Sequence, residues 1–101
     1  MITVTGCFPH LADYQVVESG RMIGRLGGAV ILHADEIHRA NIDLMIDGIA
    51  RNEVPPLVLS MPDEQEAISH ALRMLGDGSL CLLVTDDVDE AVAAIHRLAG
   101  D

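Results

Sequence analysis

Four short apolar runs alternate with four segments of helical periodicity, and this alternation is what most constrains the fold of the chain. The runs occupy residues 2–6, 29–34, 57–61 and 80–84 and are rich in aliphatic side chains. After each run, apolar residues recur three and four positions apart, as on one face of a helix. No hairpin turn signal joins two runs, so neighbouring strands are expected to be parallel. The 101 residues therefore predict one α/β domain, a Rossmann-like three-layer sandwich with a mainly parallel four-stranded sheet and helices on both faces.

The order of the strands predicts where a ligand would bind. By the Rossmann pattern we expect the order 3-2-1-4, which reverses beside the first strand. Ligands of such sheets bind beyond the carboxyl ends of the strands at this reversal. The loops that reach this place are residues 6–13, 33–39 and 85–87. The candidate ligand-binding side chains in the first and last of these loops are His10, Thr85, Asp86 and Asp87.

The helix before the fourth apolar run has clear boundary signals. Pro62 ends the third run, and the carboxylate of Asp63 is placed to accept hydrogen bonds from the first-turn amides. Glu66, three residues later, completes the pattern of a capping box. Glycines within residues 76–78 end this helix. Since residues 80–84 are all apolar, we expect the fourth strand to be covered on both faces.

The other three helices are predicted from their apolar stripes. In the first, residues 12–26, Gly20 and Gly24 form a flat strip that we expect to lie close to the sheet, since each glycine costs roughly 1 kcal/mol of helix propensity. The second opens at residues 35–39 and ends before a break at 52–56. The last, residues 88–99, is expected to bury the apolar side chains Val88, Ala91, Val92, Ile95 and Leu98.

Charge and composition exclude several classes of function. The chain contains sixteen acidic residues, six arginines and no lysine, which gives a formal charge of −10. Nucleic acids and anionic membranes are therefore not expected partners. Without lysine, the chain has neither a Walker-type phosphate lysine nor a Schiff-base lysine. It also contains no signal peptide and no apolar run of membrane length, so we expect a cytoplasmic protein.

The cysteines and histidines do not have the spacing of a metal or disulfide framework. Cys7 and Cys81 lie in or beside predicted strands and are expected to be free, buried thiols. His10, His33 and His38 follow predicted strand ends on one side of the sheet, where zinc binding together with Cys7 can be considered. Because none of these residues has the close paired spacing of a zinc site, we predict no metal.

Five short segments occur in an order and spacing that are typical of one family of enzyme domains. They are GRMIGR at residues 20–25, VILHAD at 30–35, Arg39, PDEQEAI at 62–68 and LLVTDDV at 82–88. In this order they resemble the C-terminal domain of Mur-type amide ligases, most closely that of cyanophycin synthetase. The resemblance covers nearly the whole chain, from residue 2 to about residue 98.

The resemblance implies a role in amide-bond formation. Enzymes of that family join an amino acid to a carboxylate through an ATP-derived acyl phosphate, and their C-terminal domain closes over the nucleotide and positions the amino acid. Asp35 and Arg39 match the family's D-x-x-x-R and are thereby implied to contact a nucleotide ribose or an amino acid. The chain contains no G-x-x-x-x-G-K-[ST] phosphate loop, so we expect no cofactor on its own, and Mg-ATP only together with a ligase central domain.

The chain departs from the family pattern at two places. Its loop at residues 6–13, GCFPHLAD, lacks the arginines that face phosphate or substrate in the family. The chain also begins at the family's second strand. We therefore expect an uncovered sheet edge or apolar face, which favours a homodimer or pairing with another protein.

Three functions are consistent with these features. The first is a non-catalytic, stand-alone Mur-ligase C-terminal-like domain that binds a small molecule (an amino acid or a nucleotide) or a protein partner. The second is a fragment of an ATP-dependent amide ligase, and the third is a structural or oligomerising module. In a purely structural interpretation, Asp35, Asp86 and Asp87 cap helices. Arg39 then pairs with Asp35 or Asp43 along its helix.

Overall fold

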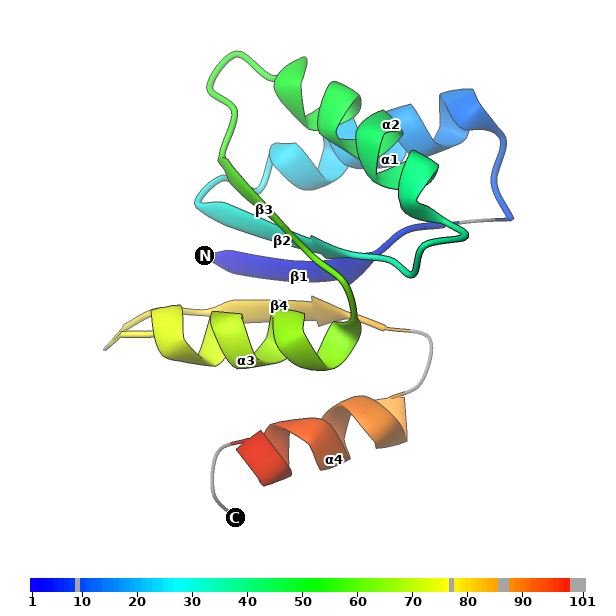
Figure 1. Ribbon diagram of the computed structural model, residues 1–101. Coiled ribbons are helices and arrows are strands. Elements are labelled where there is room, and N and C mark those ends of the chain that lie inside the picture. The colour runs from blue at the N-terminus through cyan, green and yellow to red at the C-terminus, as the bar shows by residue number, and fades with distance from the viewer. Residues whose placement is uncertain (9, 77, 86–87, 99–101) are drawn as a thin grey trace.

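The computed structural model describes residues 1–8, 10–76, 78–85 and 88–98, in which strands and helices alternate strictly (Figure 1). The strands are β1 (Ile2–Gly6), β2 (Ala29–His33), β3 (Leu57–Met61) and β4 (Cys81–Val84). The helices are α1 (Asp13–Gly24), α2 (Arg39–Ala50), α3 (Glu64–Met74) and α4 (Val88–Leu98). All four strands are parallel, in the order β3-β2-β1-β4. The predicted α/β class and strand order are therefore confirmed.

Helices cover both faces of the sheet and give the molecule three layers (Figure 1). α1 and α2 pack side by side on one face, and α3 and α4 lie on the other. Side chains along β2 alternate between the two faces, because Val30 and Leu32 join the core under α1 and α2 while Ile31 joins the core under α3 and α4. All three side chains are completely buried. The predicted Rossmann-like sandwich is thus confirmed.

The two cores are aliphatic, as expected from a chain whose aromatic residues are Phe8 and Tyr14. The core under α1 and α2 consists of Val16, Val30, Leu32, Ala34, Ile42, Met45 and Ile49. The core under α3 and α4 consists of Ile2, Val4, Ile31, Ala67, Ile68, Ala71 and Ala94. Alanines of α3 and α4 belong to this second core, so these two helices meet through small side chains.

α1 packs on α2 through glycines, which corrects the expectation that Gly20 and Gly24 would lie against the sheet. A Cβ atom added to Gly20 would overlap the backbone oxygen of Met45 in α2. Gly48 of α2 is the reciprocal case, because a Cβ atom there would overlap the backbone oxygen of Val17 in α1. The sequence pattern predicted a close approach but not its partner, since either a strand or a second helix can fill the space beside a glycine.

The side chain of Asn52 links the ends of α1 and α2 by hydrogen bonds. Its side-chain amide donates hydrogen bonds to the backbone oxygens of Arg21, at 3.1 Å, and Ile49, at 2.9 Å. Gly24 lies so close to this amide that an added Cβ atom would overlap its nitrogen. Asn52, two residues beyond the end of α2, therefore holds the last turn of α1 in place.

The fourth strand and helix are more exposed than their sequences predicted. β4 lies at an edge of the sheet, and Leu82 is 41% exposed instead of covered. In α4, Val88 is 64% exposed and Val92 45%, whereas Ala91 and Ala94 are buried. The predictions of a doubly covered strand and of two buried valines were therefore wrong. Leu82 is exposed because the apolar strand residues in the core under α1 and α2 come from β2 and β3 and not from β4. The two valines are exposed because α4 meets α3 through its alanines.

Helix boundaries follow the predicted signals in α3 but not in α2. The carboxylate of Asp63 accepts the N–H of Glu66 at 2.8 Å and caps α3 as predicted. Among the hydrogen bonds of this described segment, the return bond of a capping box from the Asp63 N–H to the Glu66 side chain is not formed. α2 begins at Arg39, because the residues before it form a turn. None of the described helices is long and apolar enough to cross a membrane.

Replacing Gly20 or Gly48 with alanine tests whether the close approach of α1 to α2 stabilises this face. Each added methyl group has to push two helix backbones apart. We expect a loss of about 1–3 kcal/mol in the free energy of unfolding, even though alanine is the better helix former. Urea denaturation followed by circular dichroism measures this loss. Gly76→Ala is the matched control, because a Cβ atom there would meet the Ser79 hydroxyl at 3.9 Å. Equal stability of all three variants would contradict the contact.

Candidate functional site

A cleft opens where the strand order reverses, between the carboxyl ends of β1 and β4. Its volume is about 290 Å³. Its described lining residues are Thr5, Gly6, Cys7, Phe8, His10, His33, Glu64, Val84, Thr85 and Glu90. They come from the ends of three strands, the loop after β1 and the first turns of α3 and α4. We call this place the switch-point cleft, and it lies where a parallel sheet of this order binds ligands.

Glu64 is the polar centre of the switch-point cleft. It is the first residue of α3, directly after the N-cap Asp63, where the helix dipole favours a carboxylate. Its Oε2 accepts a 2.8 Å hydrogen bond from the Thr85 hydroxyl and lies 3.8 Å from Nε2 of His33. The Glu64 side chain remains 26% exposed, so a ligand can reach it. One carboxylate thus connects the ends of β2 and β4 across β1.

The loop after β1 forms an uncharged wall of the cleft. Cys7 and Phe8 follow Gly6, and a Cβ atom at Gly6 would come within 3.1 Å of the His33 ring. Burial raises the pKa of Cys7 to about 11, so its thiol is neutral near pH 7. Because the thiolate is the reactive form, Cys7 contributes packing here and not a nucleophile.

The charge of the switch-point cleft is set by its carboxylates. Glu64 and Glu90 are the acidic members of the described lining, and no arginine belongs to that lining. Two imidazoles and two threonine hydroxyls add hydrogen-bonding groups. A lining of this kind attracts ammonium groups and repels phosphates.

Two of the predicted ligand-binding residues, His10 and Thr85, line the switch-point cleft. His10 reaches it from the loop after β1, and Thr85 from the end of β4. The structure thus brings the first and last predicted loops together, as the reversal of strand order requires. Asp86 and Asp87 lie outside the described residues. Ligand binding by His10 and Thr85 stays a prediction.

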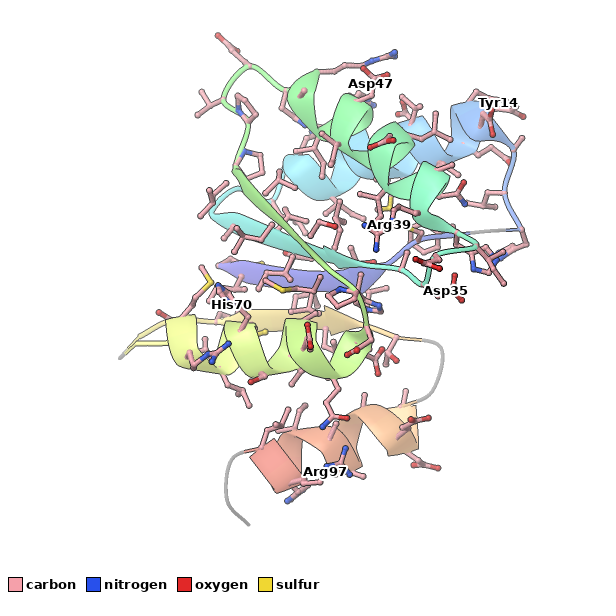
Figure 2. The ribbon with its side chains drawn as sticks, in the orientation of Figure 1. Tyr14, Asp35, Arg39, Asp47, His70 and Arg97 are labelled. Carbon is pink, nitrogen blue, oxygen red and sulfur yellow. The ribbon has the colours of Figure 1, made fainter. Side chains whose placement is uncertain are left out.

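Asp35 follows β2 and does not belong to the described cleft lining. Figure 2 shows it at the carboxyl end of the sheet, in the loop that leads to α2. Its carboxylate accepts the backbone N–H of His38 at 3.0 Å and lies 2.8 Å from Nδ1 of the same residue. The backbone bond from His38 is the main reason that the pKa of Asp35 is lowered. Asp35 therefore stabilises the turn before α2 but does not cap this helix as the structural interpretation expected, because the N-cap of α2 is His38, without a side-chain cap hydrogen bond.

Arg39 is an exposed residue at the start of α2 and is also absent from the described cleft lining. Among the ion pairs of the described residues, it pairs with neither Asp35 nor Asp43. The structural alternative for Arg39 is therefore not formed. Contact of Asp35 and Arg39 with a nucleotide or an amino acid stays a prediction.

Sequence reasoning did not place Glu64 and Glu90 in the site. Both stand in the first turns of helices, where acidic residues are usually explained by the helix dipole. A signal was available for Glu64, because the first turn of a crossover helix in a parallel sheet lies at the carboxyl ends of the strands. Glu90 could not be found in this way, since its approach depends on how α4 packs against α3.

The described histidines and cysteines do not assemble a metal site. In the parts of the chain that the structure covers, no group of three or more His, Cys, Asp or Glu side chains is placed to hold a metal ion. His38 instead contacts Asp35. Cys7 and Cys81 are free thiols, and both are only partly buried instead of buried as expected. Burial raises the pKa of Cys81 as well.

Comparison of the sequence with models of known protein families finds no match, and a search of curated proteins finds no relative. The resemblance to Mur-type ligases therefore rests on the segments at residues 20–25, 30–35, 62–68 and 82–88 together with Arg39. In the structure these segments include the glycine contact of α1, the central strand, the capped start of α3 and the edge strand. Each thus has a structural role that does not depend on the family.

The raised pKa of Cys7 predicts slow alkylation. In the Cys81→Ala variant Cys7 is the single thiol, and we expect iodoacetamide near neutral pH to react about a hundredfold more slowly than with a cysteine of ordinary pKa. The rate should rise with pH toward the raised pKa. Labelling in denaturing urea is the control, since unfolding restores the ordinary pKa. Equal rates for the folded and the unfolded protein would show that Cys7 is not buried as described.

A double-mutant cycle measures the hydrogen bond at the centre of the cleft. Glu64→Ala, Thr85→Val and the double variant are compared by urea denaturation. Because the acceptor is a partly exposed carboxylate, we expect a coupling energy of about 0.5–1.5 kcal/mol. A second cycle with Glu66→Ala in place of Glu64→Ala is the control, since Glu66 shares the helix turn but is not in the described lining. The bond is absent in solution if both cycles give no coupling.

Proposed function

We propose that this chain is a non-catalytic ligand-binding domain of the Mur-ligase C-terminal type, and that its switch-point cleft holds the amino group of a small molecule. The observation that carries the proposal is the pair of acidic side chains, Glu64 and Glu90, in a described lining without arginine. Carboxylates form their strongest hydrogen bonds with charged donors, and a protonated amine is the smallest such donor. Free amino acids are the ligand class that fits.

The volume of the cleft supports an amino acid over a nucleotide. Sites for drug-sized ligands typically enclose about 300–1,000 Å³. The switch-point cleft, at about 290 Å³, lies just below this range. The phosphates of a nucleotide would in addition meet Glu64 and Glu90 as like charges. Of the two small ligands that the resemblance implies, the amino acid is therefore the better match.

The remaining lining offers contacts for the other parts of an amino acid. The His10 imidazole can donate a hydrogen bond to its carboxylate, and the Thr85 hydroxyl, which donates to Glu64, can accept one from its amino group. Phe8 and Val84 offer apolar contact to its side chain. Such a site would position the amino group without changing it, which is the role that the resemblance implies for a C-terminal domain.

Binding without catalysis is proposed because the reactive groups of the cleft are not activated. The thiol of Cys7 is neutral near pH 7. The carboxylate of Glu64 is engaged by the Thr85 hydroxyl. An ATP-dependent reaction would also need a phosphate-binding loop, and the sequence contains none of the P-loop type.

A fragment of an amide ligase is the second candidate. Asp35 lies at the carboxyl end of the sheet, the end at which the switch-point cleft opens, and together with Arg39 it keeps the D-x-x-x-R pattern (Figure 2). In that case a ligase central domain would supply Mg-ATP, and this domain would position the amino acid. The two candidates share the amino-acid site and differ in whether a nucleotide binds.

Amide NMR titrations distinguish these functions. We expect free arginine and aspartate to shift resonances of the cleft lining, and their N-acetyl forms to bind at least about tenfold more weakly. The physical reason is that a charged hydrogen bond contributes about 1.5–3 kcal/mol, which acetylation of the amine removes. Mg-ATP is expected to leave the spectrum of the isolated chain unchanged.

Charge-neutralising variants supply the control for this titration. Glu64→Gln and Glu90→Gln keep the shape of the lining and should each weaken amino-acid binding about tenfold. Glu53→Gln, at an exposed position between α2 and β3, should not change it. Equal binding of free and N-acetylated amino acids would overturn the proposal, and Mg-ATP shifts centred on Asp35 and Arg39 would favour the ligase fragment.

A further inference from the structure

The border of the sheet formed by β4 carries an unpaired edge with exposed aliphatic side chains. β4 pairs with β1 on one side, and its other side is an edge of the described sheet. The strand itself, CLLV, has no charged residue. Leu82 within it and Leu80 just before it are both exposed. An apolar, uncharged edge of this kind pairs readily with another strand.

α4 lies along the same border of the molecule. α3 contacts β1, β2 and β3, and α4 packs beside α3 (Figure 1). Ile95 of α4 lines an apolar cleft of about 230 Å³ together with Cys81 and Leu83, which places the helix next to β4. Val88 and Val92 are one helical turn apart and exposed. The edge strand and the helix therefore both leave apolar side chains uncovered at one border.

The charges of α4 are arranged so that the helix complements a second copy of itself. Asp89 and Glu90 stand in its first turn, and His96 and Arg97 in its last. When two such helices lie antiparallel with Val92 near a two-fold axis, the acidic turn of each faces the basic turn of the other. Asp89 lies three residues before Val92 and His96 lies four residues after it. In such an antiparallel pair, Asp89 would therefore face the partner's His96.

We propose that two copies of this chain associate through β4 and α4 about a two-fold axis. The two β4 strands pair antiparallel and join both sheets into one, and the two α4 helices lie antiparallel beside the junction. One axis serves both elements, because α4 runs in the direction opposite to β4 in each copy (Figure 1). The acidic first turn and basic last turn of α4 complement each other in an antiparallel pair and favour a second copy as the occupant of this border. The inference does not depend on the ligand proposed for the switch-point cleft.

Apolar burial favours this contact, whereas the negative charge of the chain opposes it unless salt is present. Pairing satisfies the backbone N–H and C=O groups of the β4 edge and removes Leu82 and Val92 from water. The charge of −10 on each chain opposes association at long range. Salt screens this repulsion over a Debye length of about 10 Å at 0.1 M, whereas the apolar contact persists. Association is therefore best measured at about 0.3 M salt.

Sedimentation equilibrium of the full chain tests the interface. We expect the unmodified protein to dimerise, and Leu82→Asp or Val92→Asp to raise the dissociation constant at least about tenfold, since each places charge in the contact. Val54→Asp is the matched control, because Val54 is an equally apolar, exposed residue between α2 and β3 and should not alter the dimer. Circular dichroism confirms that each variant is folded. A monomer at all concentrations, or a dimer that Leu82→Asp leaves unchanged, would overturn the proposal.

A charge exchange on α4 tests the antiparallel geometry itself. Asp89→Arg alone and His96→Glu alone should each weaken self-association about tenfold, because the first removes the carboxylate that accepts from the His96 ring and the second sets two acids opposite each other, in both cases twice in the dimer. Mixing the two variants should restore a dimer, since Arg at position 89 then meets Glu at position 96 while Asp89 still meets His96. Failure of the mixture to associate more tightly than either variant would exclude an antiparallel α4 pair, and with it the interface.

Discussion

The close contact between α1 and α2 determines how the rest of the molecule is arranged. Because Gly20 and Gly48 let the two helix backbones touch, both helices fit on one face of a narrow sheet. Their shared core takes its described strand side chains from β2 and β3. On that face β4 is left open, and Leu82 is exposed. The surface proposed for a second copy of the chain is thus a consequence of how tightly two helices pack elsewhere.

Strand order determines the place and the character of the site. The strand order reverses at β1, because β2 and β3 lie on one side of it and β4 lies on the other. A cleft therefore opens at the carboxyl ends of β1 and β4. The crossover helix α3 brings Glu64 to the same place as its first residue, and Thr85 donates to it from the end of β4. Among the described residues, the acidic side chains of the cleft therefore come from helix starts.

Some parts of this structure could be predicted because their causes are local. β1 and β3 begin and end at the expected residues, and Asp63 caps α3, since apolar runs and caps act within a few positions of the sequence. The strand order followed from a general property of parallel sheets, and His10 and Thr85 were placed in the right loops by the same argument. Glu64 was missed although the first turn of a crossover helix lies at this end of the sheet, whereas the place of Glu90 depends on the packing of α4 against α3.

The sequence by itself determined the alternation of strands and helices, the aliphatic cores and the end of the sheet at which polar residues gather. These features depend on the periodicity of apolar side chains, which is a property of each segment alone. The tertiary structure decided that Gly20 meets a helix instead of the sheet, that Val92 stays exposed and that Glu64 stands between two strand ends. A segment specifies which of its faces avoids water, but the neighbour that covers this face is chosen when all the layers pack together.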